Sequence, residues 1–158
     1  MPDEQTLERA HQDARAGKSP STQAGEFVRE EMDHIREGKH GARSTKQAIA
    51  IGLSKARRAG VKLGKPKSGS VSPKTAKQIS RDTKRGKSKS RRRPSVTRSR
   101  ATTNALRREG HGAASKKSLA RQARSTARKR GATARHASAM KAVRTKRREA
   151  GHSSRKAA

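Results

Sequence analysis

Four cationic side chains recur at a helical spacing in the last third of the chain. Lys117, Arg121, Arg124 and Arg128 stand at positions i, i+4, i+7 and i+11, which places them along one face of a helix. Such a line of cations can neutralise successive phosphates of a nucleic acid. The alternative is a solvated charged face, which the near absence of acids in this region makes less attractive. With the neighbouring basic runs, the candidate nucleic-acid-binding residues are Arg91, Arg92, Arg93, Lys117, Arg121, Arg124, Arg128, Lys129, Arg130, Arg144, Lys146, Arg147 and Arg148.

Charge is distributed unevenly along the chain. The 158 residues contain 43 Lys and Arg against 12 Asp and Glu, which gives a formal net charge of +31. Residues 65–158 have a net charge of +28, whereas residues 1–38 have a net charge of −4. This asymmetry predicts a nucleic-acid partner. Because affinity for a polyanion comes mainly from the release of counterions, we expect binding to weaken steeply as salt is added.

Recognition of base sequence is not predicted. The chain has no zinc-finger spacing, no basic region that leads into heptads, and no clear recognition helix. Phe27 is the only aromatic residue, so a platform on which single-stranded bases could stack is missing. The remaining mode is contact with the backbone, with Arg side chains entering the minor groove where it is narrow.

Patterns for catalysis and metal binding are missing from the sequence. The chain contains no Cys, and neither GxGxxG nor GxxxxGK[ST] occurs. No two His are four residues apart and no cluster of Cys or carboxylates joins them, so we expect no metal site, no cofactor and no enzymatic activity. The six His are His11, His34, His40, His111, His136 and His152.

An acidic ladder has the same spacing as the basic stripe. Glu26, Glu30, Asp33 and Glu37 also follow i, i+4, i+7 and i+11 and are expected on the solvated back of an amphipathic helix. One hypothesis is an intramolecular brake, in which this ladder holds the basic stripe and competes with DNA. Two independent solvated faces are favoured, because exposed ion pairs contribute only about 0 to 1 kcal/mol each.

The apolar content predicts a small core. Leu, Ile, Val and Phe total 15 residues, well below the roughly 20% under which a highly charged chain is expected to be disordered. We therefore expect a mostly α fold with extensive disorder, in which a small helical hairpin is joined to a basic tail of separate helical segments. The expected organisation is a weak acidic N-terminal helix at 1–18, a helical hairpin module at 19–63, a basic Pro/Ser/Gly-rich linker at 64–95, and a basic tail with nascent helices at 96–158.

The hairpin is predicted from its caps and stripes. Ser19 and Pro20 fit an N-cap followed by Pro at the first helical position. Ser44 and Gln47 form a capping box at the start of the second helix. The apolar stripes of the two helices can cover each other, and the module is a candidate for self-association. Helix stops are predicted at Gly17, Gly38 and Gly60.

Helical patterns in the basic half are weaker. They cover about 73–85, 96–109, 115–130 and 133–149, and none has enough apolar surface to dock firmly. Their predicted stops are Gly86, Gly110, Gly131 and Gly151.

An imperfect internal repeat links the hairpin to the tail. Residues 36–42, REGKHGA, recur with one deletion as residues 108–113, REGHGA. We interpret the repeat as a duplicated unit of cap plus helix, although biased composition can produce some of these matches by chance.

Two parts of the sequence resemble known proteins. The tail resembles linker-histone C-terminal domains in composition, and Ser72-Pro73-Lys74-Thr75 is similar to their Ser-Pro-Lys motif. The segment at 38–63, GKHGARSTKQAIAIGLSKARRAGVKL, resembles the signature of a family of short, uncharacterised bacterial basic proteins. This second resemblance implies a bacterial source and no mechanism. It is carried by Lys39, His40, Gly41, Ser44, Lys46, Gln47, Ile49, Ile51, Leu53, Ser54, Ala56, Arg57 and Gly60.

The expected function is sequence-nonspecific DNA binding by a nucleoid-associated, DNA-compacting protein. One alternative is a basic protein associated with RNA or the ribosome, because charge alone does not distinguish the two nucleic acids. Another is a protein-interaction adaptor with a solubilising basic tail. The acidic N-terminus, the absence of a long apolar run and the absence of Cys predict a cytoplasmic, nucleoid location without membrane attachment.

Overall fold

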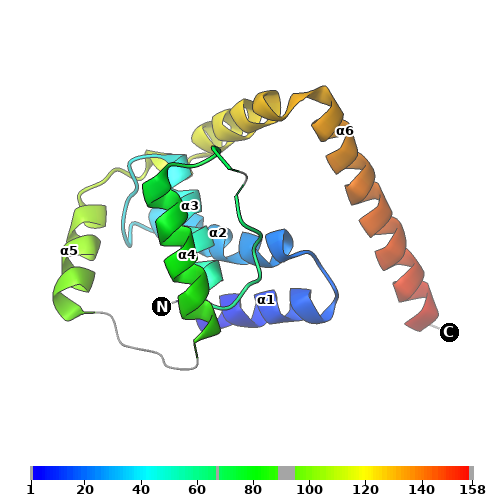
Figure 1. The fold of residues 1–158 in the computed structure, drawn as a ribbon, viewed down its shortest axis with the longest axis horizontal. Coiled ribbons are helices and arrows are strands. Elements are labelled where there is room, and N and C mark those ends of the chain that lie inside the picture. Colours follow the sequence, from blue (N-terminus) through cyan, green and yellow to red (C-terminus); the bar gives the residue numbers. More distant parts are fainter. Residues whose placement is uncertain (1, 67, 89–94, 157–158) are drawn as a thin grey trace. The chain divides into compact units, whose positions relative to one another are not determined.

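The computed structural model describes residues 2–66, 68–88 and 95–156, which contain helices and no β-strand (Figure 1). The expectation of extensive disorder beyond a small hairpin is therefore wrong: the protein is an all-α structure, and helices also form in the described part of the basic half. The elements are α1 (Glu4–Arg15), α2 (Pro20–Arg36), α3 (Thr45–Arg58), α4 (Pro73–Lys87), α5 (Val96–Arg107), the 3-10 turn η1 (Gly112–Ala114) and α6 (Lys116–Lys156).

The chain divides into two compact units, Met1–Leu119 and Ala120–Ala158. In the first unit, α2 packs against α1 and α3, while the other side of α3 packs against α4. The second unit consists of α6 beyond its first turn. Among the described residues, no helix combines the length and the apolar character that crossing a membrane requires.

Local capping chemistry sets the helix starts as predicted. The side chain of Ser19 accepts a hydrogen bond from the backbone N–H of Thr22, and Pro20 opens α2. Ser44 accepts from the N–H of Gln47, whose side chain reaches back to the N–H of Arg43. The predicted stops Gly17, Gly38 and Gly60 all adopt positive φ.

The Ser-Pro-Lys-Thr tetrapeptide has a structural explanation in this chain. Ser72 is the N-cap of α4, its hydroxyl accepts from the N–H of Thr75 at 3.2 Å, and Pro73 occupies the first helical position. The motif therefore starts a helix by the same chemistry as Ser19-Pro20.

The core of the first unit is assembled largely from small side chains, which is why the count of large apolar residues underestimated it. A Cβ added at Gly52 would lie 2.7 Å from the Cα of Val28. The backbones of α2 and α3 therefore approach each other more closely than larger residues would permit. The buried apolar residues form two clusters, Ala10, Ala24, Phe27 and Ala56 in one, and Met32, Ile35, Ala42, Ala48, Ala113 and Ala114 in the other.

Helix α4 docks through a buried polar group. Asp82 is 4% exposed and accepts a hydrogen bond from Ser54 Oγ at 2.6 Å and from Gln78 Nε2 at 3.1 Å. The guanidinium of Arg58 lies 3.5 Å from the same carboxylate. The expectation that no helix after residue 65 docks firmly is therefore wrong for α4, because a satisfied carboxylate replaces the missing apolar surface.

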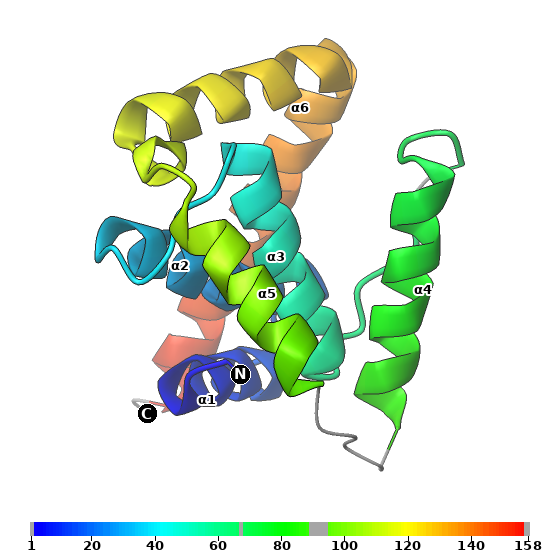
Figure 2. The same cartoon turned by 90° about the vertical axis from the view of Figure 1, so that its left-hand side faces the viewer.

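The two copies of the internal repeat lie against each other (Figure 2). The N–H of Gly41 donates to the carbonyl of Leu106 at 2.9 Å, and the N–H of Ala42 donates to the carbonyl of Gly110 at 3.1 Å. Thr45 Oγ1 donates to the carbonyl of Ala113 at 2.6 Å. These bonds attach residues 106–114, which composition assigns to the basic tail, to the start of α3.

Helix α6 is long because its residues favour helix without needing a core. Ala, Arg, Lys and Gln have high helix propensities, and they dominate this segment. Gly131 has non-helical dihedrals (φ 75°, ψ 171°), so α6 consists of two helical segments separated at the predicted stop. Gly151 does not end the second segment, because α6 extends to Lys156.

Candidate functional site

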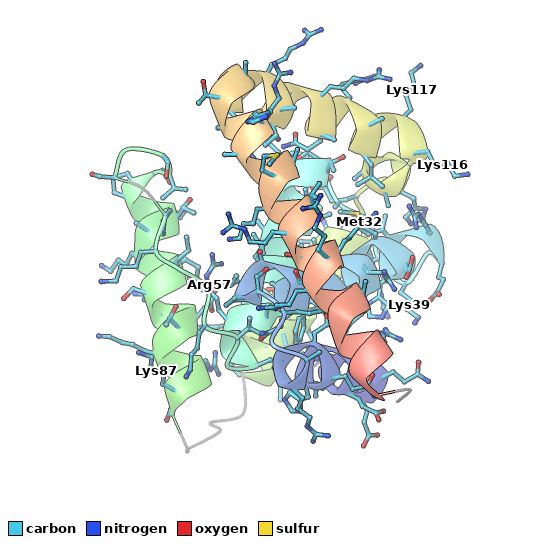
Figure 3. The ribbon with its side chains drawn as sticks, turned by 90° about the vertical axis from the view of Figure 1, so that its right-hand side faces the viewer. Met32, Lys39, Arg57, Lys87, Lys116 and Lys117 are labelled. Carbon is cyan, nitrogen blue, oxygen red and sulfur yellow. The ribbon has the colours of Figure 1, made fainter. Side chains whose placement is uncertain are left out.

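The basic surface of α6 holds a long run of cations without acids. Residues 116–148 contain 13 Lys and Arg and no Asp or Glu. All 13 side chains are exposed, and those from Lys116 to Arg147 form no ion pair among the described residues. Figure 3 shows Lys116 and Lys117 projecting away from the ribbon at the start of the helix. A polyanion can therefore reach these cations.

The predicted stripe is located on the helical segment of α6 that precedes Gly131. Lys117, Arg121, Arg124 and Arg128 share one face of this segment by their register. At 1.5 Å per residue the four span about 16 Å. Lys129 and Arg130 end the same segment, whereas Arg144, Lys146, Arg147 and Arg148 belong to the segment after Gly131. Arg91, Arg92 and Arg93 lie outside the described residues.

The acidic ladder does not form the free solvated face that the sequence predicts. Glu30 is 4% exposed, and its Oε1 accepts a hydrogen bond from Lys55 Nζ. The other three acids pair with nearby bases in Arg9–Glu26 (2.9 Å), Arg36–Asp33 (3.2 Å) and Lys39–Glu37 (2.9 Å). Glu30 is therefore not available to a brake on the basic stripe, and the other three acids each have a cation beside them.

A second group of titratable side chains is buried between α2 and α3. Glu31 is fully buried, and its Oε2 lies 2.9 Å from the Nζ of Lys55, which also lies 2.7 Å from Glu30 Oε1. Burial by itself lowers the pKa of Lys55, but its contacts with the two carboxylates outweigh that effect and raise this pKa above its usual value. One ammonium thus serves two buried carboxylates.

Two His complete this group. His40 Nε2 lies 3.4 Å from Glu31 Oε1, and His34 Nε2 lies 3.2 Å from Asp3 Oδ2. His40 Nδ1 contacts the carbonyl of Gly41 at 3.1 Å. The two rings meet edge to face, with their centroids 6.0 Å apart.

Sequence reasoning missed this group because the turn after α2 brings His40 back over the helix. The search for His at i, i+4 could not detect it. A search for Glu-x-x-His would have found Glu31 and His34, because residues three apart share a helix face. The burial of Glu31 within a charged run gave no sequence signal.

The helices and these two groups define a helical protein with a basic helix, α6, and a partly buried Glu–Lys–His cluster. Residues 15–68 match the model of a family of unknown function (DUF6496). The matched segment includes α2, α3 and the signature at 39–60, and it ends before α6. No curated protein and no solved structure matches the chain. Because the function of this family is unknown, the match does not indicate an activity for the protein.

Proposed function

We propose that the protein binds duplex DNA through its phosphates, without reading base sequence, and acts as a nucleoid-associated, DNA-compacting protein. The observation that carries this proposal is the run of 13 exposed cations over residues 116–148 with no acid among them. Like charges four residues apart repel each other on a free helix. A phosphate backbone removes that repulsion and releases its own counterions.

The contrast with the first unit supports the proposal. There the cations of α1 to α3 are largely matched by carboxylates, as in Arg9–Glu26 and Lys55–Glu30. A surface that served only solubility would not need one helix to hold so many cations without acids beside them. Concentrated single-sign charge is typical of electrostatic contact with nucleic acid.

The side chains of the first unit disfavour single-strand recognition. Phe27, the only aromatic residue of the chain, is completely buried in the core. No Phe, Tyr or Trp face is therefore available to stack on unpaired bases. Arg and Lys contacts with a regular backbone remain, and duplex DNA offers one negative charge per about 1.7 Å.

A charge-matched pair of variants tests the proposal. Replacing Arg121, Arg124 and Arg128 with Gln removes three stripe cations, whereas replacing Arg9, Arg29 and Arg36 with Gln removes the same charge from the ion-paired helices α1 and α2. We expect the stripe variant to lose much more affinity for a mixed-sequence duplex, measured by fluorescence anisotropy at fixed salt. Equal losses would refute a specific role for the stripe.

The same assay separates DNA from structured RNA. Competition by a hairpin RNA at matched charge and salt should be weaker than competition by duplex DNA. Preferential displacement by the RNA would replace the proposal with an RNA-associated function, and failure to bind either polymer would favour the adaptor.

A further inference from the structure

We propose that Glu31, His34 and His40 form a binding site for a divalent transition-metal ion of the Zn²⁺ class. One ligand atom from each residue lies within 4.8 Å of the others. Ligands around a tetrahedral Zn²⁺ are about 3.3 Å apart when the bonds are about 2.0 to 2.1 Å long. Glu31 Oε1 and His40 Nε2 already have this separation, at 3.4 Å.

The hydrogen bond of His40 determines which of its nitrogens carries a lone pair. The carbonyl oxygen of Gly41 can only accept, so the His40 Nδ1 that lies 3.1 Å away must donate to it. In the neutral ring, Nε2 then carries the lone pair. That lone pair faces Glu31 Oε1, which is buried and has no hydrogen-bond partner among the described residues.

With a neutral His40 ring, two acceptors face each other at this distance, which is unfavourable unless a proton or a metal ion lies between them. A buried carboxylate oxygen without a partner is costly. A metal ion would satisfy both atoms at once. The contact of His40 with the Gly41 carbonyl, and that of His34 with Asp3, correspond to the outer-shell bonds that orient metal-binding imidazoles.

The charge balance of the cluster also fits a dication. Asp3, Glu30 and Glu31 provide three carboxylates around His34 and His40, and Lys55 supplies one ammonium. Lys55 contacts Oε2 of Glu31 and leaves Oε1 facing His40. With neutral His rings, the group keeps two negative charges that a divalent ion would balance.

Residue types and register favour a transition metal over Mg²⁺ or Ca²⁺. Glu31 and His34 form a Glu-x-x-His pair on one face of α2, a spacing that helical bundles use for metal binding. Imidazole suits Zn²⁺ and its neighbours, whereas Mg²⁺ and Ca²⁺ prefer all-oxygen sites. Two imidazoles and one carboxylate leave a fourth position for water.

Calorimetric titration of the full-length protein with ZnCl₂, after treatment with chelator, tests the site. We expect one Zn²⁺ per chain, a rise in Tm with Zn²⁺, and no comparable response to MgCl₂. His34→Ala and His40→Ala should each weaken binding by at least about tenfold, the smallest loss typical of altering even an outer-shell partner. His136→Ala, which removes an exposed imidazole on α6, is the matched control and should bind as the wild type does.

Cobalt absorption provides a readout that is independent of stability. Co²⁺ held by two imidazoles and a carboxylate in a four-coordinate site should give visible bands that His40→Ala abolishes and His136→Ala retains. The proposal is overturned if the wild type takes up no Zn²⁺, or if both His variants bind it as tightly as the wild type. It is equally overturned if NMR at neutral pH finds a protonated His40 ring that Zn²⁺ does not displace.

Discussion

The Nζ of Lys55 lies 2.7 Å from Oε1 of Glu30, and this ion pair joins α3 to α2 in the interior of the first unit. Glu31, the next residue on α2, shares the same ammonium. Lys55→Met should therefore lower the free energy of unfolding by about 3 to 5 kcal/mol, because it leaves buried carboxylates without a counter-charge. Urea unfolding measures the change. The control is Lys39→Met, which removes an exposed ion pair with Glu37 and should leave the urea midpoint nearly unchanged.

The raised pKa of Lys55 predicts a particular loss of stability in alkali. The native state holds this proton more tightly than the unfolded chain does, so its contribution is fully present below the ordinary pKa of 10.5. That contribution is lost as pH rises through the higher native pKa, because the slope of stability with pH is negative where the native state binds more protons. Unfolding free energies measured from pH 7 to 11 should decline at the alkaline end in the wild type. The Lys55→Met variant should lack that part of the decline. If stability falls equally with pH in both proteins, deprotonation of Lys55 is not the cause.

Asp82 is predicted to hold α4 in place. Asp82→Ala removes the acceptor for Ser54 and the charge beside Arg58, so α4 should detach while α1 to α3 stay folded. Hydrogen exchange should then show lost amide protection over Pro73–Lys87 and retained protection over Pro20–Arg36. Lys84→Ala, at an exposed position of the same helix, is the control. Loss of protection in all helices together would show that α4 is not a separate docking unit.

The contact between the two repeat copies depends on Gly41. A Cβ at this position would lie 1.8 Å from the carbonyl oxygen of Glu109, so Gly41→Ala should force residues 106–114 away from the start of α3. Gly112→Ala is the matched control, because a Cβ at Gly112 would have no atom within 4 Å. The exchange rate of the Ala42 amide, which donates to Gly110, should rise in the first variant only. An unchanged rate in Gly41→Ala would mean that the two turns do not depend on each other.

Local chemistry could be predicted from the sequence better than packing could. Ser19 and Ser44 cap helices where the sequence places caps, because capping depends on neighbours within one turn. The docking of α4 through Asp82 was not predictable from apolar counts, since its partner Ser54 is 28 residues away. Tertiary contacts of this kind overrule a composition-based expectation of disorder.

The basic stripe and the Glu31–His40 cluster also differ in how far the sequence predicts them. Arg121, Arg124 and Arg128 need only one helix and their spacing, so the sequence suffices to place them on one face. The buried cluster depends on the turn that brings His40 back to Glu31. The spacing of residues along the chain does not predict that this turn places His40 beside Glu31. The acidic face around Glu30, expected to be exposed, is partly buried.

Phosphate binding by the exposed cations of α6 can be measured through the salt dependence of affinity for a mixed-sequence DNA duplex. If the exposed cations of α6 engage about six to ten phosphates, the association constant should fall roughly 10³- to 10⁵-fold between 50 and 200 mM salt, with a linear plot of log K against log salt concentration. The Arg121, Arg124 and Arg128 triple Gln variant should reduce the slope by about 2.7, which is 0.9 for each phosphate contact removed. A wild-type affinity that stays constant over this range, or no binding at the lowest salt, would show that α6 does not bind DNA through its phosphates.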